Sequence, residues 1–168
     1  MHPIVRPRRS GERGSSMVEL ALVLLPLMAL MMAIVDFSMP IFLRSTFTAA
    51  VREGCRFGVT YQLTYGGTTY TTQTDAIKAA VQANSMGFLS GTSGASLINV
   101  NYYSTVSPFS QLTGAGANSP GNILEVTVSG YNWLSIAPIW RGTGPTTINA
   151  ISSDRLENVP AGTALPTP

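Results

Sequence analysis

The sequence is poor in the residues from which most enzyme active sites are built. Its 168 residues include one histidine, His2, and one cysteine, Cys55. A Ser-His or Cys-His catalytic pair is therefore excluded from the region beyond the N-terminal leader that holds His2. Cysteine and histidine do not cluster at metal-binding spacings, and no glycine-rich stretch is followed by the Lys-Ser/Thr of a phosphate loop. We predict a protein that is not an enzyme and that uses no metal or cofactor.

Charge is also scarce, because 11% of the residues are charged where an average globular protein has about 25%. The basic residues beyond position 57 are Lys78, Arg141 and Arg155. Without a basic stripe and interleaved aromatic residues, the sequence predicts no nucleic-acid partner. The single cysteine allows no internal disulfide. It leaves an intermolecular disulfide possible, but a buried and inert Cys55 is the favoured interpretation.

What the sequence does have is a long apolar run. Residues 20–35 carry no charge, and residues 37–43 extend the run to about 20 residues or slightly more, which spans a bilayer. Four arginines precede it, with Glu12 as the one acid among them: Arg6, Arg8, Arg9 and Arg13. The positive-inside rule then predicts a cytoplasmic N-terminus and a C-terminal domain across the membrane. Three arginines on the far side oppose this orientation but are fewer: Arg44, Arg52 and Arg56.

Two other interpretations of the apolar run remain open. A cleaved secretory signal usually has an apolar core of about 7–15 residues, and this run is longer. Its small-residue cleavage candidates, Ala29 and Ala33, lie inside the run and not after it. A plain uncleaved anchor is the second alternative.

Two carboxylates lie at the ends of the uncharged residues 20–35. A charge at the bilayer centre costs about 2–3 kcal/mol and less near the edge, so Glu19, one turn inside, needs a reason. Glu19 either reaches the interface or meets a positive partner supplied from elsewhere in the membrane. For Asp36, at the other boundary, we expect a side chain that reaches water, with a functional ion pair as the alternative.

The apolar run is predicted to continue as one helix over residues 16–57, about 60 Å long. Pro26 should kink or loosen it. Past the membrane the helix is amphipathic, and Gly54 and Gly58 are candidates for its end. Its apolar face is predicted to hold Phe42, Phe47, Ala50, Val51 and Gly54, opposite Arg44, Arg52 and Arg56.

The rest of the chain predicts a small α+β domain. A loop or hairpin over residues 61–74 precedes a helix over 76–86, which we expect Thr74 and Asp75 to cap. Alternating residues predict strands over 97–103 and 123–131, and a weaker one over 146–152. In the second strand Leu124, Val126 and Val128 should face inward. An antiparallel sheet of three or four strands, packed on the amphipathic half of the long helix, is the simplest way to bury these faces.

The predicted organisation therefore has four parts. Residues 1–14 form a basic cytoplasmic leader, and residues 15–43 a transmembrane helix. Residues 44–157 form an extracytoplasmic pilin-like α+β domain, and residues 158–168 a disordered tail.

Two blocks resemble a known family. The string Gly14-Ser-Ser-Met-Val-Glu19 resembles the processing site of type IV prepilins, which has a basic leader, a glycine before the cut and a glutamate fifth in the mature chain. With the following Leu-Ala-Leu-Val-Leu-Leu-Pro-Leu, it is similar to the TadE-like family of tight-adherence (Tad, or Flp) pilus proteins. Residues 49–58, Ala-Ala-Val-Arg-Glu-Gly-Cys-Arg-Phe-Gly, resemble the segment that this family carries after its membrane helix. The C-terminal hundred residues match it in layout alone.

The resemblance implies a minor pilin or pseudopilin of a Tad pilus, active in pilus assembly and surface attachment. A prepilin peptidase would cut between Gly14 and Ser15, and Glu19 would pair in the membrane with the new α-amino group of a neighbouring subunit. Implied partners are other pilin subunits, the prepilin peptidase, the inner-membrane assembly platform and membrane lipid. The family-like segment after the membrane helix is assigned Arg52, Glu53, Gly54, Arg56 and Gly58. The alternative function is a membrane-tethered extracytoplasmic binding or adhesion domain that enters no filament.

Overall fold

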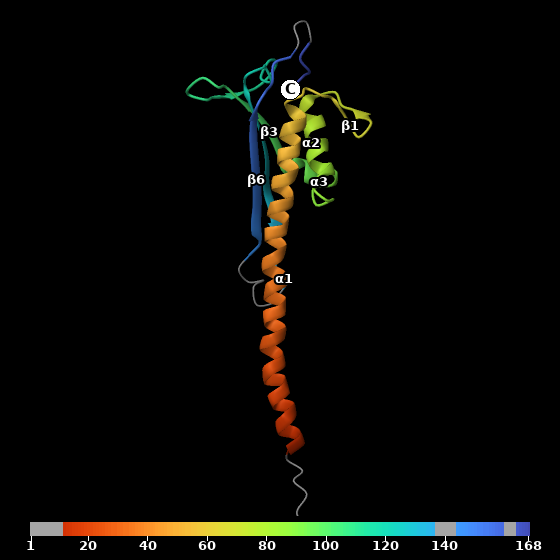
Figure 1. Ribbon diagram of the computed structural model, residues 1–168, viewed down its shortest axis with the longest axis vertical. Coiled ribbons are helices and arrows are strands. Elements are labelled where there is room, and N and C mark those ends of the chain that lie inside the picture. The colour runs from red at the N-terminus through yellow and green to blue at the C-terminus, as the bar shows by residue number, and fades with distance from the viewer. Residues whose placement is uncertain (1–11, 137–143, 160–163) are drawn as a thin grey trace, which may run out of the picture.

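The structure is dominated by one long helix. The computed structural model describes residues 12–136, 144–159 and 164–168. Helix α1 (Glu12–Gly58) runs through Pro26 and Pro40 without interruption and is about 70 Å long at 1.5 Å per residue. The prediction of a single helix is confirmed, although it begins four residues before position 16 (Figure 1). Several residues named above lie outside the described ranges: His2, Arg6, Arg8, Arg9 and Arg141.

A small α+β domain packs on the second half of α1, as predicted. A two-stranded hairpin turns at Gly66 and Gly67, and a four-stranded antiparallel sheet has the order β4-β3-β5-β6. Two short elements were not predicted from the sequence, the helix α3 and the two-residue strand β4. The elements after α1 are β1 (Thr64–Tyr65), β2 (Thr68–Thr69), α2 (Gln73–Ala83), α3 (Gly91–Ser96), β3 (Ile98–Tyr103), β4 (Gln111–Leu112), β5 (Ile123–Trp133) and β6 (Thr146–Arg155).

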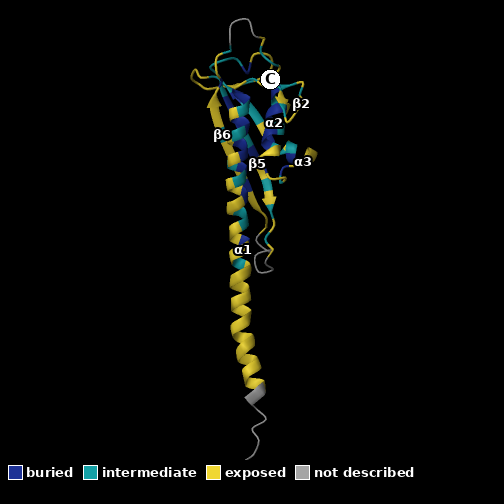
Figure 2. Ribbon diagram, turned by 45° about the vertical axis from the view of Figure 1, so that its right-hand side comes forward, coloured by how far each residue is buried: buried dark blue, intermediate teal, exposed yellow. Residues whose placement is uncertain are grey.

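The core lies between α1, the sheet and α2. One side of α1 packs against β5 and β6, and α2 packs beside it. Figure 2 shows the consequence, because buried residues appear on α1 only where it meets the domain. Phe42 remains largely exposed, while the other predicted inward residues of α1 are buried. The core includes Leu43, Phe47, Ala50, Val51, Ile77, Val81, Ile98, Leu124, Val126 and Val128.

Strand β5 is one of the two inner strands of the sheet and carries a bulge. Leu124, Val126 and Val128 are fully buried, which confirms the predicted register. The pairing with β6 then shifts between Val128 and Tyr131, where Gly130 has a φ of 78°. The extra residue reverses which side chains point inward, so Tyr131 faces α1. Its ring packs edge-on against the ring of Phe47, with 4.9 Å between the ring centroids. The strand therefore continues to Trp133 instead of ending at Tyr131.

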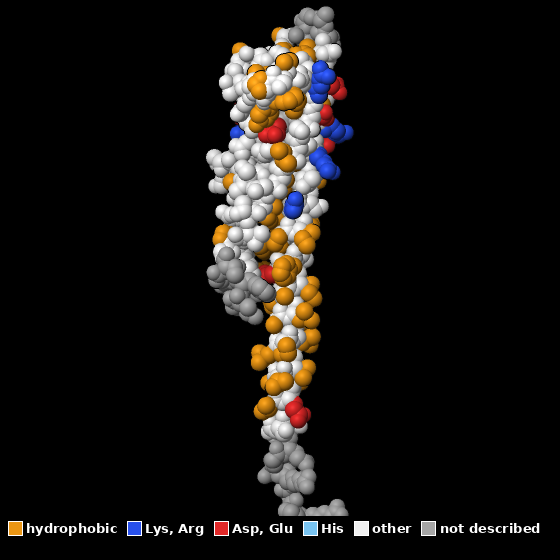
Figure 3. All heavy atoms as spheres, turned by 90° about the vertical axis from the view of Figure 1, so that its left-hand side faces the viewer, with side chains coloured by type: hydrophobic (Ala, Val, Ile, Leu, Met, Phe, Trp, Pro, Cys, Tyr) orange, Lys and Arg blue, Asp and Glu red, His pale blue; other side chains and the backbone are white. Residues whose placement is uncertain are grey.

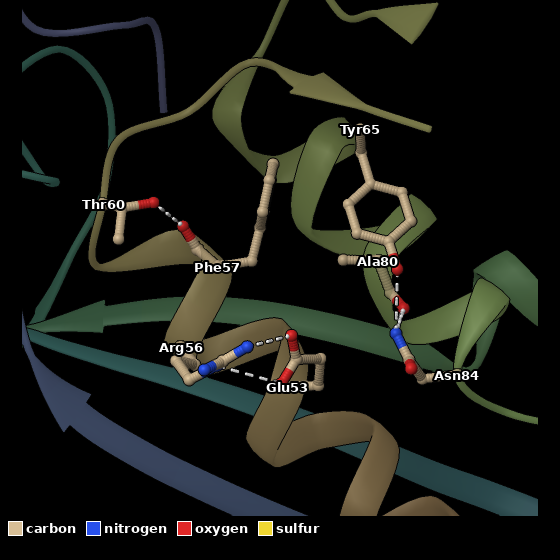
Figure 4. Close-up of polar contacts among 7 residues, drawn as sticks. All are labelled: Glu53, Arg56, Phe57, Thr60, Tyr65, Ala80 and Asn84. Carbon is tan, nitrogen blue, oxygen red and sulfur yellow. Dashed lines mark hydrogen bonds and ion pairs between the residues drawn. The ribbon is translucent and has the colours of Figure 1, made fainter. Parts of the chain in front are cut away.

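Helix α2 begins earlier than predicted. Its N-cap is Thr72, whose hydroxyl oxygen accepts a hydrogen bond from the Asp75 amide at 3.1 Å. The expected cap at Thr74 and Asp75 is wrong, because both residues already lie in the first helical turn. At the other end the Asn84 side-chain amide donates to the carbonyl of Ala80 and to the Tyr65 hydroxyl (Figure 4). These bonds hold the β1–β2 hairpin against α2.

A buried polar cluster joins the ends of several elements. The Gln73 side chain, fully buried, donates to the Gly58 carbonyl at 2.7 Å and accepts from Asn118 at 2.6 Å. The Gln73 amide donates to the Thr167 carbonyl, and the Asn118 side chain donates to the Pro166 carbonyl. Residues 164–168 were expected to be disordered, and they are instead docked on the domain by these bonds. Pro160 of the same tail lies outside the described residues.

Candidate functional site

The first half of α1 presents apolar side chains to its surroundings on every side. Helix residues from Gly14 onward include an 18-residue apolar window, none of which is buried within the protein. Figure 3 shows hydrophobic side chains over the lower part of α1, while basic side chains gather along its upper part and the domain. A helix that is apolar all round needs an apolar environment, and this one is long enough to cross a bilayer. Helix α1 is therefore the membrane anchor of the protein.

The predicted processing site lies at the start of this apolar surface. Gly14, Ser15 and Glu19 are all exposed, and a side-chain carbon built on Gly14 would meet no atom within 4 Å. The Ser15 hydroxyl donates to the Glu19 carboxylate at 3.4 Å, one helical turn away. Within the described part of the chain, no cation pairs with Glu19. Its carboxylate is thus placed among apolar side chains with a single weak hydrogen bond.

Asp36, at the other end of the apolar run, does not reach water. Its side chain is 8% exposed and accepts hydrogen bonds from the Ser135 hydroxyl at 2.6 Å and the Ile136 amide at 2.7 Å. The expectation of a solvated residue is wrong. Ser135 and Ile136, which follow β5, lie beside α1 and cover the carboxylate. The domain therefore contacts α1 from Asp36 onward.

The glycines of the family-like segment are packing residues. Gly54 and Gly58 are buried, and a side-chain carbon on Gly54 would overlap Val81 of α2. The same carbon on Gly58 would overlap Leu124 of β5 and lie 2.8 Å from Ile77. Spaced four residues apart on one face, the two glycines let α1, α2 and β5 approach closely. Gly58, and not Gly54, ends the helix.

The charged residues of the same segment face outward. The Arg56 guanidinium and the Glu53 carboxylate form an ion pair at 2.9 Å on the outer surface of α1 (Figure 4). Arg52 is exposed and borders a shallow hollow with Arg44, Ser45 and Thr48. The exposed Glu53–Arg56 pair contributes little stability, since surface ion pairs are worth about 0–1 kcal/mol. This face is free for contacts with another molecule.

Cys55 is buried and inert, as expected. Its thiol donates to the Ser152 carbonyl at 3.2 Å, and burial raises the pKa of the thiol above its ordinary value. Because the thiolate is the reactive form, this environment suppresses its chemistry. Among the described residues, no group of three or more His, Cys, Asp or Glu side chains is placed to hold a metal ion.

Sequence reasoning missed two polar anchors, Asp36 with Ser135 and Gln73 with Asn118. The sequence did contain a signal for Gln73, because its spacing places this polar residue on the same face of α2 as the buried Ile77 and Ala80. No pattern in the sequence could pair Asp36 with Ser135, because 99 residues separate them.

Comparison with known proteins bears on the N-terminal third of the chain. No curated protein and no solved structure matches the chain. One protein family, described as TadE-like protein, matches over residues 14–56. That range starts at the glycine of the predicted processing site and includes Glu19, the apolar part of α1 and most of the segment that ends at Gly58. Residues 14–56 are therefore similar to TadE-like proteins, which indicates a pilus-related protein with a membrane anchor.

Proposed function

We propose that this protein is a minor pilin or pseudopilin of a tight-adherence pilus. It is inserted with its N-terminus in the cytoplasm and is cut after Gly14 by a prepilin peptidase. The mature chain begins at Ser15, joins other pilin subunits through α1 on the inner-membrane assembly platform, and contributes to surface attachment through its outer domain.

One observation carries this proposal. Glu19 is a carboxylate on the apolar, fully exposed part of α1, and within the described residues it has no cationic partner. An isolated carboxylate in lipid is costly, whereas two opposite charges in a low dielectric attract strongly. The cut after Gly14 would create such a charge, the α-amino group of Ser15. The TadE-like match over residues 14–56 supports this assignment.

The helix geometry suits pairing between neighbours. Ser15 and Glu19 are four residues apart, so they differ in height by about 6 Å along the helix axis. Two parallel helices can therefore join the amine of one to the carboxylate of the other after a small axial shift. The pairing would neutralise a charge in the membrane and fix the axial register of the subunits.

The experiment separates cutting from assembly. Gly14→Val should leave a full-length, uncut protein, because the side chain blocks the backbone from the peptidase. Glu19→Ala should be largely cut and well inserted, yet should fail to join other pilus subunits. Met17→Ala changes an exposed residue of the same helix and is the matched control. This variant should be cut and should join other pilus subunits. Mass spectrometry of the N-terminus reports the cut, and co-purification with other pilus subunits reports assembly.

The alternative function predicts different results. A membrane-tethered binding or adhesion domain needs no cut at Gly14 and would retain its leader. A wild-type chain that keeps the leader, or that begins beyond Ala29, would contradict the pilin proposal and favour the tether or a secretory signal. Normal assembly of Glu19→Ala would refute the charge pairing and leave the cut in place.

A further inference from the structure

The chain that leaves β5 lies beside α1 at the boundary of its apolar half. Ser135 and Ile136 follow β5 and bind the two oxygens of the Asp36 carboxylate. Their donor–acceptor distances of 2.6 and 2.7 Å are those of charge-assisted hydrogen bonds. These two residues are thereby fixed to a defined height on α1.

That height is the membrane boundary on the side of the domain. From Ser16 to Asp36 the helix rises about 30 Å, which equals the thickness of the hydrocarbon core. Residues 20–35 between them carry no charge. When Glu19 lies near one boundary, Asp36 and everything bonded to it lie at the other.

The surface at this height is apolar on both elements. The Leu134 side chain is 66% exposed and that of Ile136 is 49% exposed, while Phe37 and Ile41 are exposed on α1. Phe37 and Ile41 line a cavity of about 310 Å³ together with Asp36, Trp133 and Ser135. The patch is continuous with the apolar surface of the membrane-spanning helix, so the same solvent, lipid, is the environment that covers both.

We propose that residues 134–136, which follow β5, rest in the lipid headgroup region and that Asp36 holds them there. Leu134 and Ile136 then form a second contact with the bilayer, besides α1. A second contact to one side of α1 opposes tilting of the domain relative to the membrane surface, because tilting would lift this contact out of the headgroup region or push it deeper. The proposal requires that α1 spans the membrane, but it does not require cutting at Gly14 or assembly into a pilus.

The depth of residues 134 and 136 can be measured with spin labels. Leu134→Cys and Ile136→Cys, each in the full chain, are labelled and reconstituted in vesicles of phosphatidylethanolamine and phosphatidylglycerol. Collisions are then compared for oxygen, which concentrates in lipid, and for a water-soluble nickel chelate. Val106→Cys is the matched control, because its side chain is 72% exposed and it follows the opposite end of the sheet. Wild type gives the background, since Cys55 is buried with a raised pKa and should not be labelled.

We expect the ratio of oxygen to nickel collisions to be several-fold higher at positions 134 and 136 than at 106. Equal ratios at the three positions would overturn the proposal, because residues 134–136 would then lie in water. Low collision rates for both reagents at 134 and 136 would also overturn it and would place a protein surface there instead of lipid.

Asp36 is tested in the same assay. Asp36→Ala removes both acceptors, so the ratios at 134 and 136 should fall toward the value at 106. Ser38→Ala is the matched control. Among the described residues the Ser38 hydroxyl bonds only to the Val35 carbonyl within its own helix turn, so the change should leave the ratios unaltered. A label on Phe37→Cys verifies that the helix itself keeps its depth. Unchanged ratios in Asp36→Ala would overturn its role as the holding residue.

Discussion

At the scale of single residues, the most informative positions are small or buried. Gly54 and Gly58 belong to a segment that was recognised from its sequence pattern, and the structure gives that pattern a physical meaning. Each glycine marks a point where a neighbouring element touches the backbone of α1. Such a reason could not be derived from the sequence, because it depends on where α2 and β5 return to the helix.

Gly58→Ala should destabilise the domain by about 1–3 kcal/mol, since the added carbon would force Leu124 and Ile77 to move. Ser45→Ala, on the exposed face of the same helix, should change the stability little. The rate at which a thiol reagent modifies buried Cys55 measures opening of the domain, and it should rise in the glycine variant. A Gly58→Ala protein as protected as wild type would show that the close approach is not needed.

High pH should weaken the domain through two buried groups. Burial raises the pKa of Cys55 above 9.0 and that of Tyr102 from 10.0 to about 12. Because the unfolded chain releases these protons first, the stabilisation is complete below about pH 9 and is lost as the pH rises toward the folded values. For Tyr102 the loss is about 1 kcal/mol at pH 11.

Urea unfolding followed by tryptophan fluorescence, at neutral and at high pH, tests this expectation. In Tyr102→Phe the free energy of unfolding should fall less as the pH rises. The variant should be less stable at neutral pH, because Gln73 loses a hydrogen-bond partner. An identical decline in wild type and variant would exclude Tyr102 as a source of the pH dependence.

At the scale of elements, the sequence was informative where periodicity is strong. The long helix, β3 and the inward face of β5 followed from their spacing alone. The bulge at Gly130 could not be predicted in this way. The alternation of inward and outward residues reverses there, so the predicted strand ends at Tyr131. The strand β4 and helix α3 are short and depend on their neighbours in space, so they cannot be predicted from local sequence.

The register of β5 is tested by two neighbouring substitutions. Val126→Asp places a charge in the core, where it has no partner, and should unfold the domain or lead to its degradation. Thr127→Asp faces the other side of the sheet and should cost little. Protein levels in membranes and the reactivity of Cys55 report both effects. Equal tolerance of the two substitutions would contradict the observed alternation.

At the scale of the whole molecule, membrane anchor and domain share one helix. The orientation remains a prediction from the charges before Gly14. A reporter that is active only outside the cytoplasm, fused after Pro168, should be active, because the C-terminus lies at the end of the domain far from the apolar half of α1 (Figure 1). Activity of a cytoplasmic reporter at the same position would reverse the orientation.

The shared helix also determines how the protein bears a mechanical load. Helix α1 and the long strands β5 and β6 run along the same axis (Figure 1). Tension between the outer domain and the membrane would therefore act along the interface between α1 and the sheet, and not across it. Under such shear, contacts along the whole interface, from Asp36 to Gly58, must yield together instead of one after another. A subunit built in this way can transmit a pulling force from its outer surface to its anchor without a flexible joint between them.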